Sequence, residues 1–205
     1  MQHDSQNVEP NNKVVLTGTI TQLTKENNEQ TEDFLLAVGR LSGMYDFIPV
    51  SAVDRKLLEP LAEGQTVTVT GQFISFNKIV AERSKLILMV RADEIIGVEE
   101  VDTHNPNNIT LVGFVCKTPV YRTTPFNREI ADLLLAVNRS ANKSDYIPAI
   151  AWGRNARLAK NLLVGEKVRI NGRVQSREYQ KRLNDDSIET RVAYEVSINA
   201  VERVV

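Results

Sequence analysis

Residues 165–179 read Gly-Glu-Lys-Val-Arg-Ile-Asn-Gly-Arg-Val-Gln-Ser-Arg-Glu-Tyr. Positions 168, 170, 172 and 174 are apolar or glycine, and a period of two is typical of a β-strand with one face in a core. The opposite face then carries Lys167, Arg169, Asn171, Arg173, Gln175, Arg177 and Tyr179. The segment therefore predicts a strand over 167–175, leading into a hairpin, with one buried face and one basic face that ends in an aromatic ring.

The start of this segment repeats an earlier one. Residues 64–71 recur as 165–172 at an offset of 101, and segments 33–40 and 46–49 recur as 132–139 and 145–148 at an offset of 99. Self-similarity at about 100 residues predicts two related domains in tandem, each large enough for one small core.

The order of elements in the second copy predicts the fold class. Strands are expected at 109–115, 133–137 and 146–152, an amphipathic helix at 154–163, and further strands at 167–175 and 191–198. Three strands, a helix and two strands is the order of the OB-fold, a five-stranded Greek-key barrel that binds oligonucleotides on strands 2 and 3 and the adjoining loops. The chain is thus predicted to be all-β, with two tandem OB-folds that each have a short helix between strands 3 and 4. The expected boundaries are a disordered leader at 1–12, a first OB-fold at 13–100, a linker at 101–108 and a second OB-fold at 109–205.

Charge is distributed unequally between the two copies. Residues 1–104 have a net charge of −7, whereas residues 105–205 have a net charge of +6. A basic second domain favours a polyanionic partner, although surface charge can also drift between duplicated copies. The single cysteine, Cys116, excludes an intramolecular disulfide. No signal peptide or bilayer-spanning apolar run is present, which predicts a cytoplasmic protein without a membrane partner.

Aromatic residues accompany the basic ones in the second copy. Tyr146 and Trp152 share a face of the predicted strand at 146–152, and Tyr179 follows the basic strand, with Lys181 and Arg182 beyond it. Tyr121 and Phe126 alternate with Arg122 and Arg128 in the loop after the first strand. Single-stranded nucleic acids are held by a basic groove and by rings on which bases stack, so this combination favours a single strand over a duplex. Packing of these rings in the core is the alternative.

Four segments resemble a known family. Residues 135–139 and 146–154 read Leu-Ala-Val-Asn-Arg and Tyr-Ile-Pro-Ala-Ile-Ala-Trp-Gly-Arg, and with residues 165–179 and Tyr-Glu-Val at 194–196 they resemble the bacterial single-stranded DNA-binding protein family, in its tandem-OB-fold form. The resemblance covers nearly all of residues 107–203. It implies binding of single-stranded DNA with little sequence preference, in DNA replication, recombination or repair.

The resemblance also implies roles for individual residues. Tyr146 and Tyr179 fall where the family stacks bases on Trp, and Trp152 falls where it uses Phe or Trp. A further stacking Trp, expected after Arg139, has no aromatic equivalent among residues 140–144. The predicted DNA-binding residues are Tyr121, Arg122, Arg139, Tyr146, Trp152, Arg154, Lys167, Arg169, Arg173, Arg177, Tyr179, Lys181 and Arg182. The first copy has Phe47, Val53 and Lys78 at the three aromatic positions, so it is expected to bind weakly or not at all.

The resemblance finally bears on assembly. Because tandem forms act as dimers, it implies a homodimer that presents four OB-folds. Family members typically end in an acidic tail that recruits replication and repair enzymes, whereas this chain stops directly after its last predicted strand, so recruitment by such a tail is not expected.

Other functions leave weaker traces in the sequence. His3 and His104 lie in the predicted leader and linker, and no Cys/His cluster or Gly-rich phosphate loop is found, so neither an enzyme nor a cofactor or metal is expected. Asp185 and Asp186 are interpreted as a turn. A primosome-like protein-interaction module of OB-folds, which hands DNA between partners, remains the alternative function. RNA binding also remains open, since an OB-fold accepts either sugar.

Overall fold

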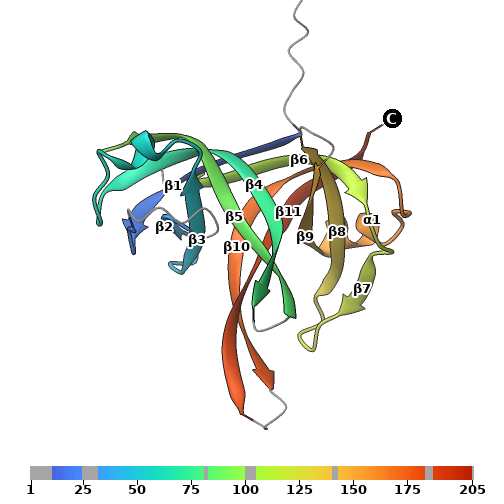
Figure 1. Ribbon diagram of the computed structural model, residues 1–205. Coiled ribbons are helices and arrows are strands. Elements are labelled where there is room, and N and C mark those ends of the chain that lie inside the picture. The colour runs from blue at the N-terminus through green and yellow to red at the C-terminus, as the bar shows by residue number, and fades with distance from the viewer. Residues whose placement is uncertain are drawn as a thin grey trace, which may run out of the picture.

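Strands dominate the computed structural model, which describes residues 11–24, 32–80, 83–99, 105–139, 143–182 and 187–204 (Figure 1). The first half contains β1 (Asn12–Thr21), β2 (Phe34–Gly39), β3 (Tyr45–Ala52), a 3₁₀ helix (Arg55–Leu58), β4 (Thr66–Val80) and β5 (Arg83–Gly97). The second half contains β6 (Asn107–Val115), β7 (Val120–Thr123), β8 (Glu129–Arg139), β9 (Lys143–Trp152), α1 (Gly153–Ala159), β10 (Lys167–Arg182) and β11 (Ile188–Arg203). Within these ranges no helix is long and apolar enough to cross a bilayer.

The same five-stranded barrel is built twice. In the first half β1 pairs with β2 and β4, β2 with β3, and β4 with β5, while parallel pairing of β3 with β5 closes the barrel. Strands β6, β8, β9, β10 and β11 repeat this pattern in the second half. The predicted tandem OB-folds are confirmed, and the second one has an additional short strand, β7, paired with β8.

The segment between strands 3 and 4 differs from the prediction in both copies. In the second copy α1 ends at Ala159, before the predicted end at 163, because the amides of Asn161 and Leu162 bond three residues back instead of four. In the first copy only a 3₁₀ helix forms, and Pro60 follows two residues after it. Since Pro60 has no amide hydrogen, it cannot donate the next bond of the helix, and the helix cannot extend.

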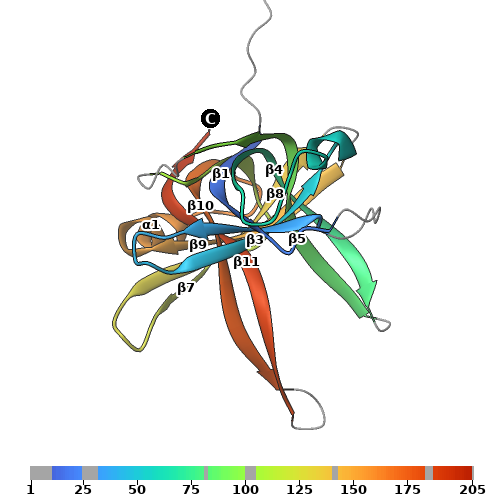
Figure 2. The same cartoon turned by 90° about the vertical axis from the view of Figure 1, so that its left-hand side faces the viewer.

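The hairpin of β10 and β11 extends further than the sequence pattern predicts. β10 continues to Arg182 and β11 begins at Ile188, and in Figure 2 this hairpin and the one formed by β4 and β5 project from the body of the molecule. Residues 177–182 are exposed, so no alternation of apolar residues marks this part of the strand. The predicted turn at Asp185 and Asp186 lies outside the described residues.

The first strand of each barrel starts earlier than expected. The sequence pattern places Asn12 in the leader and Asn107 and Asn108 in the linker, yet they open β1 and β6. Each strand starts earlier because an asparagine side chain bridges to the backbone of the neighbouring strand in the same domain. Asn12 Nδ2 donates to the Phe73 carbonyl at 2.8 Å and its Oδ1 accepts from the Phe73 amide at 3.0 Å, and Asn107 makes the same two bonds to Val174 at 2.7 and 2.8 Å. Residues 1–10 and 101–104 lie outside the described ranges.

The two barrels are joined edge to edge through β1 and β6. These strands are antiparallel, and Val14 lies opposite Ile109. Because Asn12 and Asn107 occupy equivalent positions, Val14 and Ile109 are equivalent as well, and each is the partner of the other. Pairing of equivalent residues is the mark of an isologous interface, here within one chain. A local two-fold axis therefore passes between Val14 and Ile109 and relates the two OB-folds.

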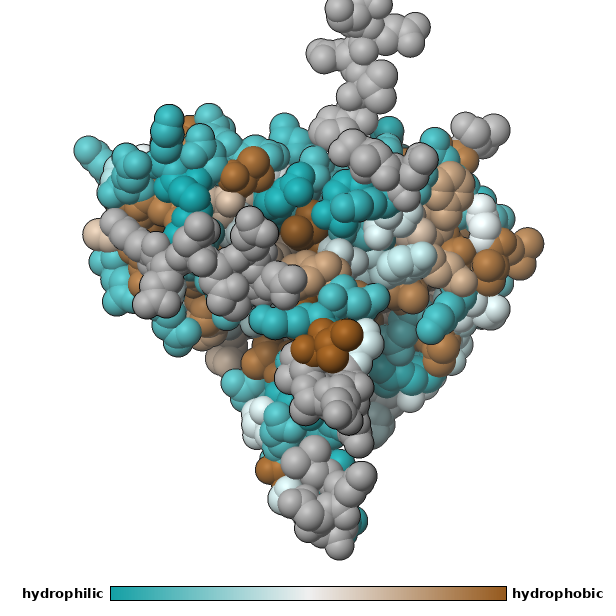
Figure 3. Space-filling view, in the orientation of Figure 1, coloured by the Kyte–Doolittle hydropathy of each residue, from teal (hydrophilic) through white to brown (hydrophobic). Residues whose placement is uncertain are grey.

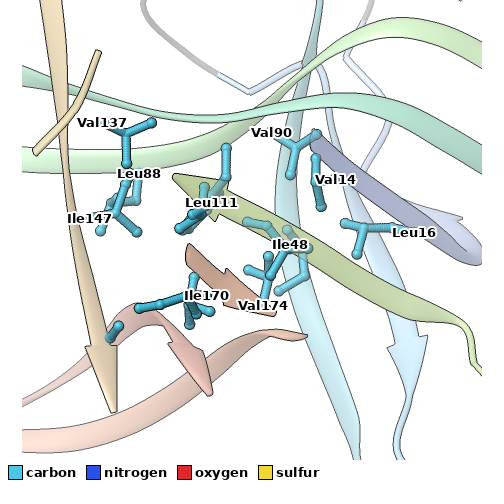
Figure 4. Packing of buried hydrophobic residues seen from close by; sticks show 14 of the residues in the cluster. Val14, Leu16, Ile48, Leu88, Val90, Leu111, Val137, Ile147, Ile170 and Val174 are labelled. Carbon is cyan, nitrogen blue, oxygen red and sulfur yellow. The ribbon is translucent and has the colours of Figure 1, made fainter. Parts of the chain in front are cut away.

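One hydrophobic core runs through both barrels, instead of one separate core in each. All of its residues are buried, and Figure 4 shows Val14, Leu16, Ile48 and Val90 from the first half in the same cluster as Leu111, Val137, Ile147, Ile170 and Val174 from the second. Val168, Ile170 and Val174 of β10 point into it, as the period of two predicts. The shared core and the shared sheet fix the two domains relative to each other.

We expect Gly172→Ala to lower the free energy of unfolding by about 1–3 kcal/mol, which is typical of overpacking. A Cβ at Gly172 would lie 2.2 Å from the Ser197 carbonyl oxygen at the irregularity between β10 and β11, so the backbone would have to move. The measurement is urea unfolding. Gly39→Ala is the matched control, since its Cβ would meet its nearest neighbour at 3.8 Å, and equal stability of the two variants would contradict the argument.

Candidate nucleic-acid interface

Trp152 ends β9 and lines a surface hollow together with four arginines. The hollow has a volume of about 360 Å³, and the arginines are Arg40, Arg128, Arg173 and Arg177. Ala151 and Ile147 of the same strand are buried, whereas Trp152 is 40% exposed, so its ring is available at the surface. We call this site the tryptophan hollow. A flat ring surrounded by guanidinium groups can hold a base and the neighbouring phosphates.

One buried carboxylate, Asp46 of the first domain, organises two of these arginines. Arg40 Nε donates to Asp46 Oδ2 at 2.7 Å, and Arg173 Nη1 lies 3.5 Å from the same oxygen. Burial and the adjacent charge of Arg40 lower the pKa of Arg173, while Asp46 opposes this change. The hydrogen bond to Asp46 raises the pKa of Arg40. Asp46 therefore holds both guanidinium groups at the boundary between the domains.

The same carboxylate binds the backbone of the second domain. The Ser176 amide donates to Asp46 Oδ1 at 2.6 Å, and Arg40 Nη2 donates to the Ser176 carbonyl at 2.9 Å. These bonds connect β3 of the first domain directly to β10 of the second.

The local two-fold axis repeats this contact in the opposite direction. Asp145 is buried in the second domain and accepts the amide of Ser75, in β4 of the first, at 2.6 Å. Arg139 Nε lies 3.2 Å from Asp145 Oδ2. Burial raises the pKa of Asp145, and the Ser75 amide, Arg139 and Arg91 partly counteract it. Arg139, a predicted DNA-binding residue, is thus engaged in a structural ion pair.

The other predicted stacking residues are exposed but lie apart from the tryptophan hollow. The exposed fractions are 48% for Tyr146 and 38% for Tyr179. The Tyr146 amide donates to Ser75 Oγ at 2.7 Å, which places the backbone of Tyr146 beside β4 of the first domain. Tyr179 lies under the Arg177 guanidinium, 5.9 Å from the ring centroid, and lines a second hollow of about 450 Å³ between the two long hairpins.

Tyr121 and Arg122 on β7 are bound to neighbouring side chains. Tyr121 packs against the core, its hydroxyl donates to the Glu129 carboxylate, and Lys160 lies over its ring at 4.9 Å. The hydrogen bond to Glu129 raises the pKa of Tyr121. Arg122 forms an ion pair with Asp132 at 3.0 Å. Tyr121 is therefore only half-exposed in this structure, and Lys160 lies over its ring.

The remaining predicted cations are dispersed. Arg154 is exposed on α1, and Lys181 and Arg182 lie at the end of the β10 arm. Lys167 and Arg169 lie where β10 pairs with β6, and Arg169 is 3.8 Å from Glu202. Gln175, expected on the solvent face, is buried because its Nε2 donates to Glu195 Oε1 at 2.7 Å. Of the predicted residues, the structure gathers Trp152, Arg173 and Arg177.

Arg40 and Arg128 are the two arginines of the tryptophan hollow outside the predicted set, and Gln175 and Ser176 also line it. Arg40 belongs to the first domain, and only the position of Ser176 on β10 brings it to the site. The sequence contains one signal for the role of Arg40, which is the recurrence of Arg40 and Asp46 as Arg139 and Asp145. Both pairs form ion pairs in the structure. Among the residues that the structure describes, no group of three His, Cys, Asp or Glu side chains could hold a metal ion.

Comparisons with known proteins point to one family. Residues 106–204 match the model of the single-strand binding protein family. Single-stranded DNA-binding protein 1 of Staphylococcus aureus (strain COL) is 36% identical over 83 residues, which cover 37% of this chain and 50% of that protein. For single-stranded DNA-binding protein 1 of Lactococcus lactis the identity is 37%, over 37% of this chain and 55% of that protein. The chain spans about half the length of these relatives.

A solved structure resembles the whole chain. The wild-type single-stranded DNA binding protein from Thermus aquaticus matches with a TM-score of 0.66 and 22% identity, over 95% of this chain and 93% of that one. At this identity the likeness establishes the shared fold, including both OB-folds.

Proposed function

Because residues 106–204 match the model of the single-strand binding protein family, we propose that this chain binds single-stranded DNA with little sequence preference and protects strands exposed in replication, recombination or repair. It acts as a binding protein and not as an enzyme. It acts in the reducing cytoplasm, where the single free thiol, Cys116, is stable. The observation that carries the proposal is the tryptophan hollow, in which one exposed indole is surrounded by four arginines.

The geometry favours a single strand over a duplex. An indole that is 40% exposed offers a stacking surface to an unpaired base, whereas a base inside a duplex is covered by its neighbours. Arginines supply charge to phosphates without reading sequence. Tyr146 and Tyr179 provide two further rings, and the exposed cations of the second domain, Arg154, Lys181 and Arg182, extend the positive surface that surrounds them.

We also infer a homodimer that presents four OB-folds. The outward face of the joined sheet supports it, since Phe114 of β6 is exposed there and Val15 and Val112 are only half-buried. Light scattering should give about twice the chain mass of 23.0 kDa.

The decisive test uses the intrinsic fluorescence of Trp152, the single tryptophan of the chain. Titration with oligo-dT should quench this fluorescence, while duplex DNA should not. If the four arginines neutralise four phosphates, the slope of log K against log salt should be about −2.8, so a fourfold rise in salt weakens binding about 50-fold.

The same titration separates the competing functions. Equal quenching by oligo-rU would indicate RNA binding. An absence of quenching and of binding by an independent assay would contradict the proposal and favour the primosome-like interaction module.

A further inference from the structure

The carboxylate of Asp46 occupies the edge of Arg40 that a phosphate would use. Arg40 Nε donates to Asp46 Oδ2 and Arg40 Nη2 donates to Asp46 Oδ1, so two parallel bonds join the guanidinium fork to the carboxylate. Arg40 Nη2 also donates to the Ser176 carbonyl at 2.9 Å. This fork binds carboxylates and phosphates in the same bidentate way. Of the five N–H groups of an arginine, these bonds leave only the two on Nη1 for a strand.

A second arginine of the tryptophan hollow is also engaged by this carboxylate. Arg173 Nη1 lies 3.5 Å from Asp46 Oδ2, and Arg173 Nη2 donates to Gln175 Oε1 at 3.1 Å. Asp46 is only 1% exposed, so its charge acts from beneath the molecular surface, one face of which Figure 3 shows. Salt screens a buried charge less than an exposed one. The carboxylate therefore offsets one of the four positive charges that line the hollow.

The second copy contains the same carboxylate in different surroundings. Asp145 is as buried as Asp46 and pairs with Arg139, as Asp46 pairs with Arg40. The first-domain equivalents of Trp152, Arg173 and Arg177 are Val53, Gln72 and Phe76. Both carboxylates thus contact the opposite domain, whereas Asp46 is the one that is bonded to arginines of the tryptophan hollow.

We propose that Asp46 limits the affinity of the tryptophan hollow, because it competes with strand phosphates for Arg40 and Arg173. The inference rests on the proposed function and deepens it, since it concerns the same site. A phosphate reaches the Arg40 fork only when the guanidinium leaves Asp46, and a buried carboxylate that loses its partner is costly. Fewer than four phosphates are then neutralised, and a bound strand dissociates more readily than four free arginines would allow.

The test replaces the carboxylate by an amide of the same shape. Asp46→Asn removes the charge and keeps an oxygen that can accept from the Ser176 amide. Binding of oligo-dT should become about tenfold tighter, which is the lower end of what one hydrogen bond to a charged group contributes. The slope of log K against log salt should become steeper by about 0.7, the value for one further phosphate on a single strand. Quenching of Trp152 at several salt concentrations measures both quantities.

Asp145→Asn is the matched control for this variant. It removes an equally buried carboxylate that pairs with Arg139, away from the exposed indole. We expect it to leave the affinity for oligo-dT and the salt slope unchanged. Equal tightening by both variants would assign the effect to the net charge of the protein and overturn the inference. Weaker binding by Asp46→Asn would overturn it as well, because Asp46 would then position the arginines for the strand.

Two arginine variants test the same competition without altering the carboxylate. Arg128 lines the hollow and forms no ion pair with any residue that the structure describes. Arg128→Gln should flatten the salt slope by about 0.7, whereas Arg40→Gln should leave the slope unchanged, because Asp46 already occupies the Arg40 fork. Equal flattening by the two variants would contradict the inference while leaving the proposed function intact. Failure of the unaltered protein to bind oligo-dT would overturn the proposed function itself.

Discussion

Asp46→Ala should lower the free energy of unfolding by about 3 kcal/mol. The substitution leaves the guanidinium groups of Arg40 and Arg173 and the amide of Ser176 without their shared acceptor. Breaking a buried ion pair from one side costs about 3–5 kcal/mol, and the lower end applies because the two arginines keep 29% and 33% of their side-chain surface in solvent. Urea unfolding followed by circular dichroism measures the change.

An exposed ion pair provides the matched control for this variant. Asp132 also pairs with an arginine, Arg122 at 3.0 Å, but both side chains are largely in solvent. Asp132→Ala should therefore cost less than about 1 kcal/mol. Similar losses in the two variants would show that Asp46 contributes no more than a surface charge. Asp145→Ala should behave like Asp46→Ala, since Asp145 makes the reciprocal contact to Ser75.

Trp152→Ala should weaken the binding of oligo-dT about 5- to 150-fold, which corresponds to the 1–3 kcal/mol that stacking on one ring contributes. The indole lies at the surface at the end of β9, so the loss should appear in affinity with little change in stability. Because the intrinsic fluorophore is removed, the measurement is the anisotropy of a fluorescein-labelled oligomer.

The duplicated chain supplies its own control for this variant. Val53 occupies the position of Trp152 in the first domain and is also exposed. Val53→Ala should leave the affinity unchanged, and Trp152→Phe should retain most of it. If Trp152→Ala bound oligo-dT as tightly as the unaltered protein, the bases would have to stack elsewhere, and the tryptophan hollow would lose its proposed role.

The fold could be predicted because its determinants are local and repeated. Val168, Ile170 and Val174 alternate with polar residues, and their burial in the structure follows from that period alone. The long arms of β10 and β11 could not be predicted, since two strands that pair outside the barrel need no apolar face. The contacts of Asn12 and Asn107 were equally hidden, because an asparagine near a domain end is more often part of a loop than a bridge between strands.

The candidate site was only partly accessible from the sequence. Trp152, Arg173 and Arg177 all belong to the second domain, where the sequence predicts the binding strands. In the structure they line one hollow. Arg40 joins them through its bond to the Ser176 carbonyl of the second domain, a contact that no pattern within either copy specifies. Arg139 shows the opposite case, in which a cation that looked available is held by the buried Asp145.

The pairing of Val14 with Ile109 has a consequence for how the protein can change over generations. When two separate identical chains meet across a symmetry axis, each mutation appears on both sides at once, and dilution separates the partners. Joining the copies in one polypeptide makes their association independent of concentration. It also lets each side vary alone, so that one copy can keep Trp152 while the other carries Val53, and each can specialise without disturbing the shared sheet.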